Sequence, residues 1–154
     1  AKKRESMEKS KLATREHIDN VREKLSIVII ELIKRQNNHD KSKLETPEVE
    51  IFDKYTPKLK NLTYGSEEYT DCLKNMTVAL KHHYKYNSHH PEHFINGIQG
   101  MDLIDLVEMF CDWVAASERH KDGDVYKSIE INKNRFNMST ELRDIFKNTV
   151  ELFK

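Results

Sequence analysis

Apolar residues recur three to four positions apart along most of the chain, which is the spacing of an amphipathic helix. The first such stretch predicts a helix over residues 8–36, and Pro47 suits the first turn of a short helix in the less regular segment 41–65. Ser66, Asp102 and Ser139 are typical N-caps. They predict helices that begin after each cap, over about 67–86, over 103–121 and, after Ser139, a last amphipathic helix. A further helix is predicted over about 125–136. With no period-2 strand, the pattern predicts an all-α, single-domain bundle of about five to seven helices.

Composition narrows the function classes. The chain has 154 residues, with 26 Lys+Arg and 26 Asp+Glu, so we expect one domain and no extended nucleic-acid surface. The apolar run 27–30 stops at Glu31, so no segment is predicted to cross a membrane. Cys72 and Cys111 lack CxxC spacing and the first residues lack a signal-like apolar core, which predicts reduced thiols in the cytoplasm. The C-terminal helix is a candidate homodimer surface.

Histidine is concentrated in one short segment. Five of the eight histidines fall within twelve residues, and they are His82, His83, His89, His90 and His93. Helical phase places His83 on the apolar face of its helix, and a loop carrying His89 and His90 can fold back over the helix end. Burying several imidazoles separately would need many hydrogen-bond partners, so a shared metal ion is the simpler explanation. A core histidine and exposed neighbours are the alternative.

Two further groups offer ligands. His39 and Asp40 follow the end of the first helix, where both can converge on Mn, Fe, Co, Ni or Zn, with Mg less favoured by histidine; an ordinary surface pair is the alternative. On the 103–121 helix, the expected core stripe runs through Leu103, Leu106, Val107, Phe110 and Val114. The opposite face carries Asp105, Glu108, Asp112 and Arg119. That face is either solvated or lines a polar pocket.

This order of residues resembles the HD superfamily of metal-dependent phosphohydrolases. The string His39-Asp40-Lys41-Ser42-Lys43 is similar to His-Asp-x-Gly-Lys, with Ser42 in place of glycine. The resemblance implies an HD-like helical fold over residues 1–154 and one or two divalent metals. Residues 1–8, which precede the first predicted helix, are expected to be frayed. His83 (or His82), His89-His90 and Asp112 match in order the ligands of the two-metal branch, which includes HD-GYP phosphodiesterases and mixed-valent di-iron oxygenases such as myo-inositol oxygenase. The implied ligands are His39, Asp40, His83, His89, His90 and Asp112.

The superfamily also uses an upstream histidine, for which His17 is the candidate. His17 and His39 are 22 residues apart, which is about 33 Å along an unbroken helix. His17 therefore joins the site only if the helix breaks, for example near Ser26.

A closer resemblance, over roughly residues 12–150, is to a small uncharacterised family of bacteria and their phages. It rests on four stretches, at residues 39–48, 64–69, 89–94 and 105–113. We expect hydrolysis of a phosphoester in a nucleotide or another small phosphorylated metabolite. Lys43 and Arg119 would neutralise phosphoryl charge, and Glu108 would orient a ligand or water. The alternatives are a di-iron oxygenase and a non-enzymatic binding module with a structural metal site.

Overall fold

The structure, a computed structural model, describes residues 1–63, 66–119 and 121–154. Within these ranges it contains seven α-helices, four short 3-10 helices and no strand, which confirms the predicted all-α class and helix number. Tyr64 and Gly65, which open one of the four similar stretches, lie outside the described residues. In the described part, no helix is both long enough and apolar enough to cross a membrane.

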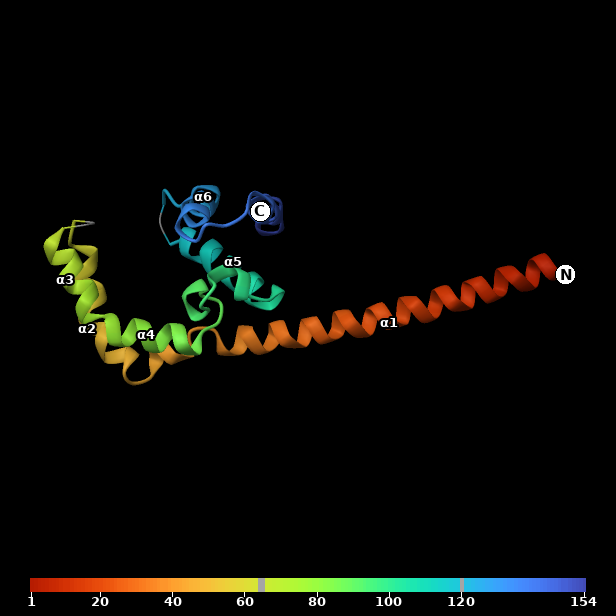
Figure 1. Cartoon of the computed structure of the whole chain (residues 1–154), viewed down its shortest axis with the longest axis horizontal. Helices are drawn as coiled ribbons and strands as arrows, with labels where there is room; N and C mark the ends of the chain where they lie inside the picture. Colours follow the sequence, from red (N-terminus) through yellow and green to blue (C-terminus); the bar gives the residue numbers. More distant parts are fainter. Residues whose placement is uncertain (64–65, 120) are drawn as a thin grey trace. The chain divides into compact units, whose positions relative to one another are not determined.

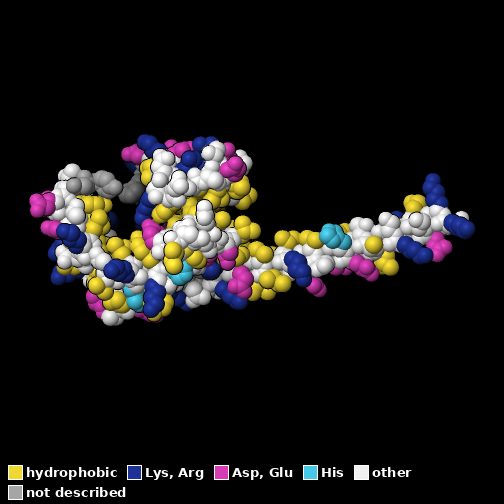
Figure 2. All heavy atoms as spheres, in the orientation of Figure 1, with side chains coloured by type: hydrophobic (Ala, Val, Ile, Leu, Met, Phe, Trp, Pro, Cys, Tyr) yellow, Lys and Arg dark blue, Asp and Glu magenta, His cyan; other side chains and the backbone are white. Residues whose placement is uncertain are grey.

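The chain divides into two compact units, Ala1–Asn37 and Asn38–Lys154. The first unit consists of helix α1 (Lys2–Asn38) up to Asn37. This helix begins earlier than predicted and is continuous in Figure 1. Apolar and charged side chains alternate along it (Figure 2). Ion pairs one turn apart, such as Lys9–Glu5 and Arg22–Asp19, support the helix. No break occurs near Ser26.

The second unit begins with the 3-10 helix η1 (Lys41–Leu44) and continues through α2 (Glu48–Lys60), α3 (Glu67–Asn75) and α4 (Thr77–Tyr86). The predicted helix over 67–86 is therefore two helices, which meet at Met76. Pro57 lies inside α2, and the helix continues past it to Lys60. Ser66 caps α3 as predicted, because its hydroxyl accepts from the amide of Tyr69.

The rest of this unit comprises η2 (Pro91–His93), η3 (Gly97–Gly100), α5 (Leu103–Ser117), α6 (Val125–Arg135), α7 (Thr140–Thr149) and η4 (Val150–Phe153). The predicted N-caps Asp102 and Ser139 both accept from the third residue that follows. A single apolar core joins α5, α6 and α7. Its buried members are Met109, Phe110, Val114, Ile129, Met138, Phe146 and Val150.

Helix α5 is buried on two sides, and this corrects the predicted core stripe. Leu103 and Val107 are 77% and 43% exposed, whereas Met109 is 2% exposed. Asp105, assigned to a face that was either solvated or pocket-lining, is 3% exposed. Its carboxylate accepts from Ser88 Oγ in the histidine-bearing loop. One side of α5 thus packs in the core, while the acidic side faces the loop after α4.

Candidate metal centre

The cluster is organised around Asp40, which lies immediately before η1. Its backbone is left-handed, with φ of 53°, a conformation that Asp and Asn adopt more readily than most residues. The Asp40 carbonyl accepts from the amide of Lys43, and the Asp40 carboxylate lies 2.7 Å from Lys43 Nζ. The tight turn therefore leaves one carboxylate oxygen, Oδ2, against Lys43 and points the other, Oδ1, toward the histidines.

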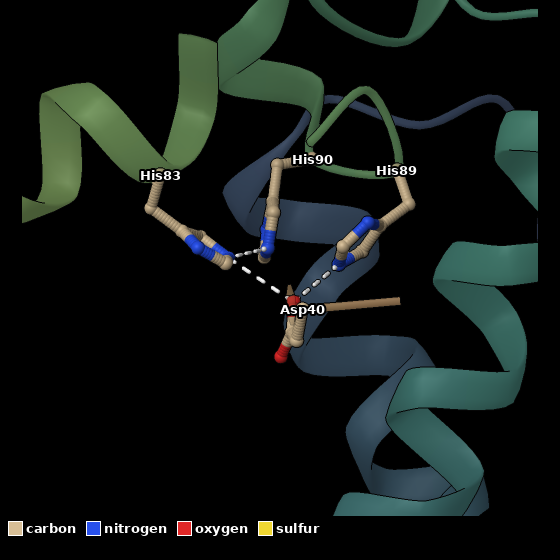
Figure 3. A group of neighbouring side chains, drawn as sticks. All are labelled: Asp40, His83, His89 and His90. Atoms are coloured by element: carbon tan, nitrogen blue, oxygen red, sulfur yellow. Dashed lines mark hydrogen bonds and ion pairs between the residues drawn. The ribbon is translucent and has the colours of Figure 1, made fainter. Parts of the chain in front are cut away.

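Three histidines converge on Asp40 from α4 and the loop that follows it (Figure 3). Asp40 Oδ1 lies 3.3 Å from His83 Nε2 and 3.4 Å from His89 Nε2. The Nε2 atoms of His83 and His90 are 2.9 Å apart. His83 and His89 are 2% and 1% exposed. The four side chains offer ligand atoms within 4.8 Å of one another, so they form a candidate metal site.

A second group of His39, His89 and Glu108 adjoins the first. The Glu108 carboxylate lies 2.8 Å from His39 Nδ1 and 3.2 Å from His89 Nδ1. Asp112, one turn further along α5, lies 4.0 Å from His39 Nε2 and 3.7 Å from His89 Nε2. Glu108 therefore contacts Nδ1 of both His39 and His89, and Nε2 of each ring faces the space between Asp40 and Asp112.

The charges of the cluster are strongly coupled. Burial raises the pKa of Asp40, but contacts with His83, His89 and Lys43 outweigh it and hold that pKa far below its usual range. Burial lowers the pKa of His89, yet Asp40 and Glu108 raise it to about 9. Burial and the neighbouring His89 and His83 lower the pKa of His90 to about 3. Hydrogen bonding to Glu108 raises the pKa of His39.

The hydrogen bonding of these groups fits a cation. Among the described residues, Asp40 Oδ1 and both ring nitrogens of His89 are buried side-chain atoms without a hydrogen-bond partner. Leaving such atoms unpaired is costly, and their contacts at 3.2 to 3.7 Å lack hydrogen-bond geometry. Imidazole nitrogens and carboxylate oxygens are ligands for Mn, Fe, Co, Ni and Zn. The buried cluster therefore has the donor set of a divalent metal site.

The other candidate residues lie elsewhere. Lys43 is at the exposed edge of the cluster, with 43% of its side chain exposed. Arg119 follows the end of α5 with an exposed side chain and makes no ion pair with any residue that the structure describes. His93 Nδ1 donates to the carbonyl of Tyr84. His17 lies within α1, and the break that its assignment requires does not occur. The candidate groups form without it.

Glu48 is the functional candidate that the sequence did not single out. It is fully buried at the start of α2, with one oxygen 2.8 Å from His82 Nδ1 and the other 3.0 Å from His83 Nδ1. In the sequence, Pro47-Glu48 indicated the start of a helix and ended the similar stretch 39–48, but neither observation gave Glu48 a role. A contact across 35 positions with His83 leaves no signal in local spacing, so this residue emerges only from the folded chain.

Fold and cluster together define an all-α protein with a candidate metal centre. The sequence model of the Family of unknown function (DUF5662) matches residues 6–152, so the chain belongs to that family. This confirms the resemblance to an uncharacterised family, while membership of the HD superfamily stays a prediction. No curated protein and no solved structure matches the chain.

Proposed function

We propose that this protein is an HD-type, metal-dependent phosphohydrolase acting on a nucleotide or another small phosphorylated metabolite in the cytoplasm. The observation that carries the proposal is the convergence of imidazole Nε2 atoms on Asp40, whose Oδ1 has no hydrogen-bond donor among the described residues. His39, Asp40, His83, His89, His90 and Asp112 would hold one or two ions. When bound, such an ion polarises a phosphoryl oxygen and lowers the pKa of water toward neutrality.

The two sides of the cluster differ in access. His83 and His89 are buried, whereas the side chains of His39, Asp112 and Lys43 are 32%, 25% and 43% exposed. A phosphorylated substrate would therefore approach from the side of these three residues. Lys43 is close enough to Asp40 to be held there and exposed enough to donate to a phosphoryl oxygen. The exposed position of Arg119 gives no support for the phosphate-binding role that the sequence suggested.

The test is metal analysis combined with a substrate panel. Protein purified with added Mn, Fe or Zn should contain one or two equivalents of metal. It should hydrolyse a member of a panel of nucleotides, cyclic dinucleotides and phosphomonoesters, with turnover lost on chelation. Asp112→Asn should reduce turnover at least about 10-fold, since loss of a charged group at a metal site removes direct stabilisation. His93→Ala, from the same histidine-rich segment but outside the candidate groups, is the matched control.

Three results would contradict this proposal. Metal-free protein after purification with all three ions would remove its basis. About two equivalents of iron with oxygen-dependent turnover would indicate the oxygenase alternative instead. Bound metal that raises the melting temperature, without turnover of any phosphoester, would indicate a structural metal in a binding module.

A further inference from the structure

Glu48 is fully buried, and each of its two carboxylate oxygens faces an imidazole. Its Oε2 atom accepts from Ser42 Oγ at 2.9 Å and lies 3.0 Å from His83 Nδ1. Its Oε1 atom lies 2.8 Å from His82 Nδ1. An ionised carboxylate can only accept hydrogen bonds, so both imidazoles must donate through Nδ1. The lone pair of His83 then resides on Nε2, the atom that faces Asp40 and His90.

A second layer of hydrogen bonds holds this arrangement. The Asn87 side-chain amide is buried and donates to Ser42 Oγ and to the carbonyl of His83, both at 2.8 Å. Ser42 Oγ thus accepts from Asn87 and donates to Glu48, so the hydroxyl acts as both acceptor and donor. Ser42 occupies the position at which the HD pattern has glycine. A glycine there could not make either contact, because it has no side chain.

We infer that Glu48, held by Ser42 and Asn87, is a positioning residue that fixes the tautomer and direction of His83 so that Nε2 can bind a metal ion. The inference rests on the metal site of the proposed function, but not on turnover. Glu108 is placed to act in the same way on His39 from the opposite side of the cluster, through its 2.8 Å contact with Nδ1. Carboxylates behind ligating histidines typically raise metal affinity by about 10- to 100-fold.

The decisive variant is Glu48→Gln, which keeps the shape of the side chain. A Gln amide has one acceptor and one donor group, so it cannot accept from both His82 and His83. If its NH2 faces His83, that ring must accept at Nδ1 and carry its proton on Nε2, where it blocks the metal. Titration of the chelated protein with Zn²⁺ and Mn²⁺ should show affinity about 10- to 100-fold lower. Nitrogen NMR of the metal-free protein should show His83 moving from the Nδ1–H to the Nε2–H tautomer.

Glu50→Gln is the matched control, since Glu50 lies on the same helix, is exposed and accepts from Thr46 Oγ1 rather than from a histidine of the cluster. Its metal affinity should equal that of the wild type. If Glu48→Gln does not fold, Ser42→Ala decides, because it removes one hydrogen bond and leaves the carboxylate. A loss of metal affinity of about 5-fold is then expected.

The inference is overturned if Glu48→Gln, or Ser42→Ala in its place, binds both ions as the wild type does. A wild-type protein that binds neither ion overturns both the inference and the proposed function. By contrast, wild-type protein that binds metal but hydrolyses no phosphoester contradicts the proposed function alone, since the affinity and tautomer measurements still apply. Turnover with an unchanged Glu48→Gln affinity contradicts the inference alone.

Discussion

Replacing Asp40 by Asn tests the centre of the cluster at the least cost to the fold. Asp40 is left-handed, and Asn is, like Asp, tolerant of that conformation. An Ala at this position would add strain of roughly 1–2 kcal/mol and confuse the result. Asn keeps the size of the side chain and removes the charge that faces His83, His89 and Lys43. Any change in metal response then reports the carboxylate itself.

The size of the effect follows from ligand linkage. An ion that binds only the folded state stabilises it by about 2.7 kcal/mol at a free concentration of 100 times Kd. For a chain of this length, each kcal/mol shifts the melting temperature by about 2–4 °C. Chelated wild-type protein should therefore melt about 5–10 °C higher after saturation with its metal. Asp40→Asn should lose most of this increase, because it removes the anionic ligand shared by the histidines.

Thermal melts by circular dichroism, with and without added Mn²⁺, Fe²⁺ or Zn²⁺, provide the measurement. Asp71→Asn, an exposed change on α3, is the control and should keep the full increase. The metal-free Asp40→Asn protein should also melt below metal-free wild type, because His89 loses a partner that favours its protonated form. A metal-induced increase in Asp40→Asn equal to that of wild type would refute the assignment of Asp40 as a ligand.

Three further predictions concern charge, packing and substrate. The pKa of His89 is raised above its ordinary value of 6.5 to about 9, so its contribution to metal-free stability is complete below pH 6.5 and lost as pH rises through 9. The melting temperature of the chelated protein should fall between pH 6.5 and pH 9.5, and a melting temperature that does not change over this range would contradict this. Ile129→Ala should cost about 2–5 kcal/mol in urea unfolding, since Ile129 is fully buried in the core. Lys43→Gln should lower kcat/KM about 10-fold while metal content, measured by elemental analysis, stays unchanged; equal kcat/KM would exclude its contact with substrate.

The sequence predicted the helices wherever a local signal marks their ends. Ser66, Asp102 and Ser139 each cap a helix, because capping depends on one side chain and the next three residues. The joint at Met76 carries no such signal and was missed. The core phase of α5 was wrong at Leu103 and Val107, because hydrophobicity alone cannot identify a helix that buries acidic residues against a polar cluster as well as apolar ones against a core.

The same contrast applies to the candidate centre. Order along the chain was enough to select His39, Asp40, His83, His89 and His90, which the structure brings into the two candidate groups. Asp112 lies beside them. Arg119 was selected by helical phase alone, and it follows the end of α5 with an exposed side chain. Phase gives a direction around a helix axis, but it does not show where that helix ends relative to its neighbours.

The number of histidines in the segment identifies the candidate metal ligands less well than the ring nitrogen that each histidine directs at Asp40. His82 and His83 are adjacent and both contact Glu48 through Nδ1, yet only His83 has its Nε2 beside Asp40. The two rings share the same buried carboxylate, so the tautomer does not separate them. The direction of Nε2 does, because α4 turns His83 inward and leaves His82 about 30% exposed. His83 is a candidate ligand because Glu48 holds its Nδ1 while α4 aims its Nε2 at Asp40. A substitution at Glu48 changes the orientation of the His83 ring, whereas a substitution at His83 removes the ligand itself. Comparing the two therefore distinguishes orientation from ligation.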